Sequence, residues 1–180
     1  MLDHDHTTST IATTATESAG SAARLALLGA ITLVGLSAGF FVAYLSSVTR
    51  GLAEVGDTAY VETFQAINAS VRNPLFGLVF FGPVPALVLA IATNWAAAST
   101  PRRVLMAAAL PLYLATIAIT GTGNVPLNND LAEVVVSSPE VAAAARAAFE
   151  DDWNRFNLMR TVAVVASFVS LGAAATLVDD

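Results

Sequence analysis

The polar side chains that could bind a ligand recur at helical spacing in two stretches of an otherwise apolar chain: Gln65, Asn68 and Asn73, then Asn124, Asn128, Trp153, Asn157 and Arg160. Residues three or four apart share one face of a helix. Amides, an indole and a guanidinium can bind a polar aromatic compound and donate hydrogen bonds to an oxyanion. We therefore predict that these residues line one ligand site. The spacing alone identifies no catalytic residue.

Several chemistries are excluded by residue type. The chain has no Cys and no Lys, so thiolate and Schiff-base chemistry are absent. Its two histidines, His4 and His6, lie near the N-terminus, where they lack the rigid frame that a metal site needs. We predict no metal and no cofactor. No Gly-rich phosphate loop follows a strand, and a net charge of −6 disfavours nucleic acid as a partner.

The composition is that of a membrane protein. Of 180 residues, 56% are hydrophobic and 12% are charged, and the mean hydropathy is +0.67. Soluble domains are roughly 45–50% apolar and about 25% charged. We expect membrane lipids and a small aromatic ligand as partners. The oligomeric state stays open.

Four uncharged segments are long enough to cross a bilayer, at residues 25–48, 75–93, 104–123 and 161–178. Backbone polar groups in lipid must be satisfied within the segment, so each span is a helix. We predict an all-α, four-helix transmembrane bundle. Residues 25–180 form this membrane domain.

The first 24 residues differ in composition from the spans. They are rich in Thr, Ser and Ala without hydrophobic periodicity, and we expect a disordered tail over residues 1–24. Arg24, Arg102 and Arg103 lie close to span ends on one side of the membrane. The positive-inside rule then favours a cell membrane protein with both termini in the cytoplasm, although the raw count of arginines opposes this orientation.

Four spans place the first and third connections on the same side of the membrane. We expect an amphipathic helix in each: one from about Glu54 to Val71, and one over Pro139–Phe149. Simpler interpretations of their polar residues stay open. Gln65 and Asn68 would then lie on a solvated face, Asn124 and Asn128 would cap a helix end, and Trp153 would be an interfacial belt residue.

Small residues and prolines should shape the spans. Gly35, Gly39 and Ala43 follow a spacing that lets helices pack closely. Gly82-Pro83-Val-Pro85 should kink the second span and Pro111 the third. Tyr113 lies in mid-span and should face protein, because its hydroxyl needs a hydrogen-bond partner.

Five segments carry a resemblance to a known family: Gly39-Phe-Phe-Val-Ala-Tyr44, Phe64-Gln-Ala-Ile-Asn68, Asn73-Pro-Leu-Phe76, Gly123-Asn-Val-Pro-Leu-Asn128 and Trp153-Asn-Arg-Phe-Asn-Leu-Met-Arg-Thr161. In this order they resemble the anthrone oxygenase-like family of small four-helix integral membrane proteins, over about residues 35–172. Most members have no demonstrated activity, and the family is largely a domain of unknown function. Many members carry His where this chain has Asn157.

The resemblance implies a function. The family's named activity is the cofactor-independent oxidation of an anthrone to an anthraquinone by O₂. By the resemblance, the amides and Arg160 would donate to an oxyanion, Trp153 would stack on the substrate ring, and Glu62 or Asp130 would be weak candidates for the base. The alternative is a non-enzymatic membrane protein that binds a lipid, a quinone-like ligand or a partner subunit. Oxygen uptake with an anthrone separates the two.

Overall fold

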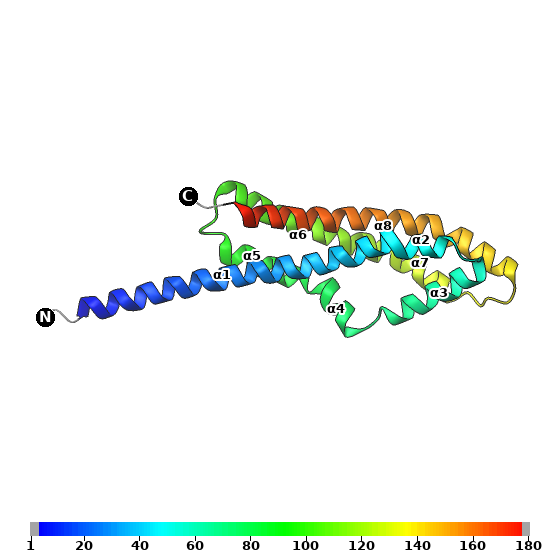
Figure 1. The fold of residues 1–180 in the computed structure, drawn as a ribbon, viewed down its shortest axis with the longest axis horizontal. Helices are drawn as coiled ribbons and strands as arrows, with labels where there is room; N and C mark the ends of the chain where they lie inside the picture. Colours follow the sequence, from blue (N-terminus) through cyan, green and yellow to red (C-terminus); the bar gives the residue numbers. More distant parts are fainter. Residues whose placement is uncertain (1–3, 178–180) are drawn as a thin grey trace.

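The structure is a computed structural model that describes the backbone of residues 4–177 and the side chains of residue 18 and of residues 20–177. Every regular element in this part of the chain is a helix (Figure 1). The elements run in the order α1 (His4–Ala43), η1 (Tyr44–Val48), α2 (Thr49–Ala53), α3 (Asp57–Ser70), α4 (Pro74–Phe81), α5 (Pro83–Asn94), α6 (Thr100–Ile119), η2 (Thr120–Asn124), α7 (Val125–Ala132) and α8 (Pro139–Thr176). The predicted all-α class is confirmed.

Four helical segments of the described chain are long and apolar enough to cross a membrane: Gly20–Ala53, Pro74–Asn94, Thr100–Ala132 and Pro139–Thr176. The first three predicted spans lie within the first three segments. The fourth falls within α8 except for its last two residues, 177 and 178, of which 178 is outside the described part. The helix predicted over Pro139–Phe149 is not separate, because α8 continues through it into the membrane.

Side-chain caps and prolines set where the helices begin and break. Asn73 accepts a hydrogen bond from the backbone N–H of Phe76 at 2.9 Å, and Pro74 follows as the first helical residue. The predicted break in the second span is confirmed, since α4 ends at Phe81 and α5 begins at Pro83. Pro111, in contrast, lies inside α6 without ending it.

Tyr113 holds the broken span against its neighbours. Its side chain is fully buried, as predicted, and its hydroxyl donates to the Phe80 carbonyl at 2.8 Å. The hydroxyl oxygen of Ser37 lies 2.9 Å from the hydroxyl oxygen of Tyr113. One phenol therefore joins α6, α4 and α1 near the break.

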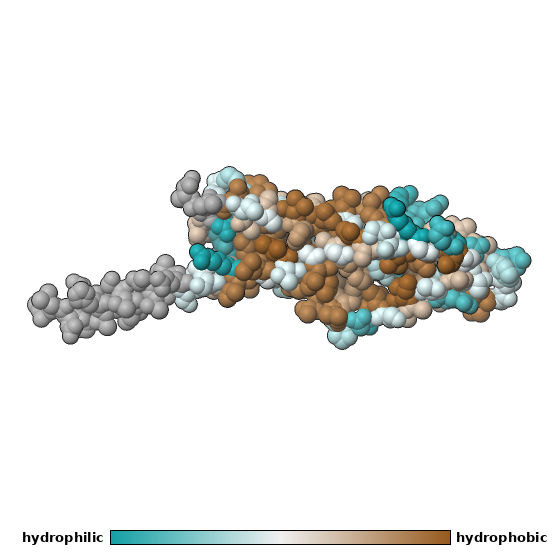
Figure 2. Space-filling model, in the orientation of Figure 1, coloured by the Kyte–Doolittle hydropathy of each residue, from teal (hydrophilic) through white to brown (hydrophobic). Residues whose placement is uncertain are grey.

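The apolar core lies between the spans, and the molecule is apolar on the outside as well. Val34, Leu87, Met106 and Leu171 have no more than trace exposure in this core. Large side chains such as Leu75 point outward, and apolar surface covers the middle of the molecule (Figure 2). This is the surface that lipid covers in a multi-pass membrane protein.

The predicted small-residue packing holds at only one glycine. A Cβ at Gly35 would lie 2.9 Å from the ring of Phe168, so α8 approaches α1 closely there. A Cβ at Gly39 would meet nothing within 4 Å. The interpretation of Gly39 as a packing residue is wrong, because this side of α1 borders an open groove.

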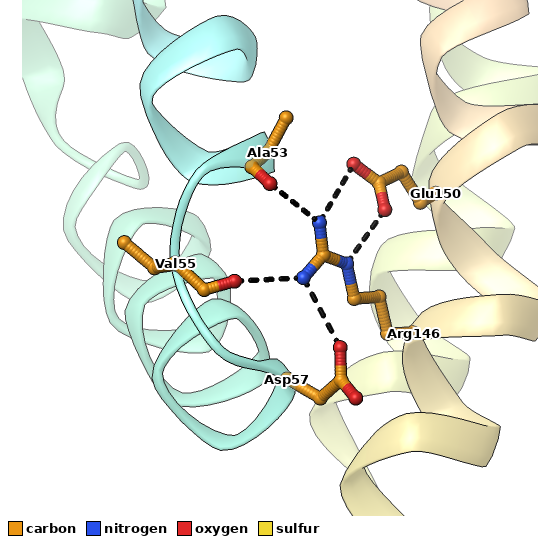
Figure 3. A network of polar contacts seen from close by, with 5 residues as sticks. All are labelled: Ala53, Val55, Asp57, Arg146 and Glu150. Atoms are coloured by element: carbon orange, nitrogen blue, oxygen red, sulfur yellow. Dashed lines mark hydrogen bonds and ion pairs between the residues drawn. The ribbon is translucent and has the colours of Figure 1, made fainter.

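Arg146 joins the two long connections at one end of the bundle (Figure 3). Its guanidinium donates to the backbone carbonyls of Ala53 at 3.2 Å and Val55 at 2.8 Å. It also pairs with Asp57 at 3.1 Å and with Glu150 at 2.6 Å. The two long connections therefore meet at the same end of the bundle, as the predicted topology requires.

Tyr60 lies beneath this network on α3. Its ring centre is 4.4 Å from the guanidinium carbon of Arg146. Burial, with the nearby charge of Glu150, raises the pKa of the Tyr60 phenol. The phenol therefore stays neutral and serves as a packing surface for the arginine.

The boundary between a tail of residues 1–24 and the membrane domain stays a prediction. The helical backbone of α1 begins at His4, while residues 1–3 and the side chains of residues 4–17 lie outside the described part.

Candidate functional site

Two short π-helical turns aim side chains into the space between the helices. In η1 the N–H of Thr49 bonds to the carbonyl of Tyr44, and in η2 the N–H of Val125 bonds to that of Thr120. A π turn inserts one extra residue into the helical ladder and so re-aims the side chains around it. Tyr44 and Thr120, the first residues of the two turns, line the same cavity.

Local sequence accounts for the second turn. Pro126 has no N–H to donate to the carbonyl of Thr122, so the regular ladder cannot continue. A Cβ at Gly123 would lie 2.5 Å from the ring of Phe156, so only glycine lets α8 come this close. Together these residues bring η2 against α8 at the level of the cavity.

The cavity has a volume of about 420 Å³, within the usual range for small-molecule sites of roughly 300–1,000 Å³. Its walls come from α1, η1, α3, α4, η2, α7 and α8. The aromatic lining residues are Phe40, Phe41, Tyr44, Phe76, Phe80, Phe81 and Trp153. The polar ones are Asn68, Arg72, Thr120, Asn128, Asn129 and Arg160. Flat aromatic walls with a few polar groups suit a planar, mostly apolar ligand.

Arg160 is a buried cation on the cavity wall. It is 6% exposed, and its Nε and Nη2 donate to the Oδ1 of Asn157 at 3.1 and 3.0 Å. Its guanidinium carbon lies 4.6 Å from the ring centre of Phe41 and 5.0 Å from that of Trp153. Within the described residues it forms no ion pair with a carboxylate. Amide and ring contacts offset its burial only in part, so an anion in the cavity would be strongly attracted.

Trp153 is held in place by two asparagines. Its indole N–H donates to the Oδ1 of Asn128 at 2.7 Å, and its carbonyl accepts from the Nδ2 of Asn124 at 3.1 Å. The centre of its ring lies 4.8 Å from the ring centre of Phe64 of α3. The orientation of the indole is therefore determined from three sides.

Three buried amide atoms around this centre have no hydrogen-bond partner in the described part of the protein: Asn68 Nδ2, Asn124 Oδ1 and Asn157 Nδ2. An unsatisfied buried polar atom costs about 1–3 kcal/mol. Native proteins contain few such atoms, and a ligand-binding role is one of the explanations for them.

The structure brings six of the predicted site residues to one region and leaves two outside it. Asn68, Asn128, Trp153 and Arg160 line the cavity, and Asn124 and Asn157 lie directly behind Trp153 and Arg160. That these residues bind a ligand stays a prediction.

The remaining two residues serve the backbone. Gln65 donates to the carbonyls of Leu131 at 2.8 Å and Val134 at 2.9 Å, which fastens α3 to the end of α7 and to the segment that follows it. Asn73 caps α4 and is exposed. Periodicity could not foresee the use of Gln65, which depends on backbone far along the chain, whereas the Asn73 cap is local to the start of α4.

Sequence reasoning missed most of the aromatic lining. Phe40 and Phe41 of α1 contact Phe76 and Phe80 of α4 in the cavity wall, with ring centres 5.1 Å apart for Phe40 and Phe76 and 6.1 Å apart for Phe41 and Phe80. The available signal was the presence of paired aromatic residues, Phe40–Phe41 and Phe80–Phe81, in two neighbouring spans.

Among the described residues, no acidic side chain lines the cavity. Glu62 and Asp130, the two candidates for a base, are both exposed and do not line it. No group of three or more His, Cys, Asp or Glu residues gathers within the described residues. The lining can therefore hold a ligand and stabilise negative charge, but it offers no carboxylate or imidazole to take a proton.

A family model described as anthrone oxygenase matches residues 64–170. The match covers more than half of the chain and includes every polar residue of the cavity lining. No curated protein and no solved structure matches the chain.

Proposed function

The chain belongs to the anthrone oxygenase family, and from this premise we propose that it oxidises an anthrone-like polycyclic aromatic compound with O₂ and without a cofactor. The site for this reaction is the aromatic cavity between α1, α3, α4, α7 and α8. The observation that carries the proposal is Arg160, a buried cation without a carboxylate partner in the described chain, set against the rings of Phe41 and Trp153.

The reaction needs no electron carrier, because the substrate supplies the electrons. Loss of a proton from the ring CH₂ gives an enolate, whose carbon forms a bond to O₂. The resulting peroxide anion takes up a proton to become a hydroperoxide, which then loses water and leaves a ketone at the same carbon. The CH₂ group and O₂ thus become C=O and H₂O, and all electrons that leave the carbon end on oxygen.

The protein's part is to bind the rings and stabilise the enolate oxygen. Trp153, fixed by Asn128 and Asn124, offers a ring face for stacking. Arg160 beside it holds a positive charge toward the oxygen on which negative charge develops. Asn68, whose Nδ2 has no partner within the described residues, is the second donor candidate on the lining.

The proton goes to solvent in this proposal. The lining holds no carboxylate and no imidazole, so the enolate forms because Arg160 makes the bound substrate more acidic. Exposed Arg72 and Asn129 at the rim, 3.5 Å apart, border a polar opening through which water reaches the cavity. The rate should therefore rise with pH until the bound substrate is fully ionised.

We also propose the location and orientation. The end of the bundle opposite the cavity holds Arg24 before the first span and Arg102 and Arg103 before the third. This arrangement supports a cell membrane protein with the termini in the cytoplasm and the cavity toward the outer face.

Oxygen uptake tests the function. Purified protein in lipid nanodiscs is supplied with anthrone, and oxygen consumption and anthraquinone absorbance are followed against empty nanodiscs. We expect matched consumption of O₂ and formation of anthraquinone well above the spontaneous rate. Binding of the product without any turnover would overturn the catalytic proposal and favour a non-enzymatic ligand binder.

A further inference from the structure

A second and larger hollow lies beside the cavity, on the membrane-facing side of the bundle. It has a volume of about 1,070 Å³ and is an open groove between α1, α3 and α4. Its walls are almost entirely apolar, with Ile31, Leu36, Leu75 and Val79 among them. Leu36 is 54% and Leu75 71% exposed, so the groove opens to the lipid side.

The groove and the cavity are neighbours separated by side chains. Phe40, Tyr44, Val71 and Phe76 line both of them. Phe40 lies 4.9 Å from Tyr44 and 5.1 Å from Phe76 between ring centres. Three of the four shared residues are aromatic, so rings from α1, η1 and α4 make up much of the partition.

The break between α4 and α5 accounts for the groove. The N–H of Gly82 still bonds to the carbonyl of Leu78 at 2.9 Å, but Pro83 and Pro85 donate no bonds to the turn before them. A Cβ at Gly82 would lie only 2.3 Å from the Leu78 carbonyl oxygen, so the bend requires glycine. On the N-terminal side of this bend, α4 leans away from α1 (Figure 1).

The side of the cavity that faces the connections is closed by a layer of aromatic residues. The ring centre of Phe64 lies 4.7 Å from that of Phe149 and 4.8 Å from that of Trp153. The ring centre of Tyr60 lies 5.6 Å from that of Phe64. Leu52 and Leu131 complete this cluster. Apart from the polar opening bordered by Arg72 and Asn129, a large apolar compound meets this aromatic layer, whereas the groove offers an open and mostly apolar approach.

We propose that the groove is a lateral access route, through which a planar polycyclic aromatic compound dissolved in the acyl-chain region reaches the cavity. Phe40 and Phe76 form its gate. The proposal rests on the proposed function for the identity of the compound. Its physical basis is that such a compound partitions into the bilayer and meets mostly apolar surface from the lipid to the gate, with Thr63, Ser70 and Asn73 among the few polar lining residues. Rotation of two ring side chains opens the path without moving a helix.

A plug in the groove tests this route. Gly39 lines the groove but not the cavity, and nothing lies within 4 Å of its Cβ position, so the backbone there tolerates a side chain and Gly39→Phe places a ring in the groove. Gly29→Phe is the matched control: Gly29 is also on α1, also open around its Cβ position and outside the groove. Both variants are made in a Trp95→Phe background, which leaves Trp153 as the only tryptophan.

The measurement is the rate at which anthraquinone quenches Trp153 after vesicles carrying it are mixed with proteoliposomes. Gly39→Phe should slow this rate about tenfold or more relative to Gly29→Phe, with equal final quenching, because access and not affinity is changed. Equal rates in the two variants would overturn the route. Loss of copurifying lipid from Gly39→Phe at an unchanged rate would assign the groove to an acyl chain and also overturn it.

The same data separate the two proposals. If wild-type protein does not oxidise anthrone but Gly39→Phe slows anthraquinone binding, the proposed reaction fails and the access route stands. If wild-type protein oxidises anthrone and the two variants bind anthraquinone equally fast, the reaction stands and the route fails.

Discussion

Replacing Arg160 by methionine tests the electrostatic role of the cavity most directly. Methionine fills similar space on α8 but carries no charge. A substrate ring stacked on Trp153, whose centre lies 5.0 Å from the guanidinium carbon, places an adjacent oxygen close to the cation. Two unit charges about 4 Å apart interact by about 4 kcal/mol at an effective dielectric constant of 20. Removing one oxyanion donor from an enzyme costs about 10²–10³ in rate. We expect kcat/KM for anthrone oxidation to fall by that factor.

The stability effect of the same change has two opposing parts. Asn157 Oδ1 loses both of its donors, and its Nδ2 already lacks a partner in the described chain, so the amide costs about 1–3 kcal/mol. The protein also no longer buries an unpaired cation, which offsets some of that loss. The double variant Arg160→Met, Asn157→Leu removes the amide as well. We expect it to melt near the wild-type temperature while its activity stays as low as that of the single variant.

The assay compares oxygen uptake and thermal melting, with and without anthraquinone, for these variants and for Arg155→Met. Arg155 is on the same helix but exposed, and it pairs with Asp152 at 3.1 Å. Its replacement should change neither rate nor melting temperature appreciably. The reasoning is refuted if Arg160→Met keeps kcat/KM within about threefold of wild type, because transition-state stabilisation by the cation would then be negligible.

Three further changes probe the frame that holds the site. Gly82→Ala should destabilise the protein by about 1–3 kcal/mol, because its Cβ would lie 2.3 Å from the Leu78 carbonyl oxygen. Gly77→Ala in α4 is the control, since its Cβ meets open space. Equal melting temperatures of the two variants would contradict this account of the bend. Arg146→Met should expose the segment between α2 and α3 to protease, because the side chain loses its contacts to Ala53, Val55, Asp57 and Glu150. Cleavage no faster than in Arg155→Met would show that these contacts do not hold the segment in place. Tyr113→Phe should lower stability by about 1 kcal/mol through loss of the bond to the Phe80 carbonyl; an unchanged melting temperature would mean that this bond is dispensable.

Much of the fold was predictable from local sequence. Uncharged runs of spanning length identify the four spans, because lipid leaves the backbone no alternative to a helix. Asn73–Pro74 and Gly82–Pro83 mark helix boundaries, because a capping amide and a missing N–H act within one turn. Four spans then dictate that the two long connections share one side, and the contacts of Arg146 join them at the same end of the bundle.

The site was predictable only in part. Helical spacing correctly grouped Trp153, Asn157 and Arg160, because residues three or four apart lie on the same face of a helix whatever packs against that face. It could not say what lies opposite that face. Gln65 and Asn68 are three residues apart, yet Gln65 donates to backbone carbonyls at the end of α7 and just after it, while Asn68 lines the cavity.

The amino-acid sequence by itself determined the membrane class, the helix positions and the chemistry that the residue types allow, because these depend on composition and on neighbours within a turn. Only the tertiary structure decided that Phe40, Phe76 and Trp153, far apart in the chain, enclose one cavity with Arg160 on its wall. Two π turns, a bend at Gly82 and the close contact of Gly123 with Phe156 set that enclosure. The physical reason is that a helix presents its whole circumference, and only packing against other helices determines which part becomes a site.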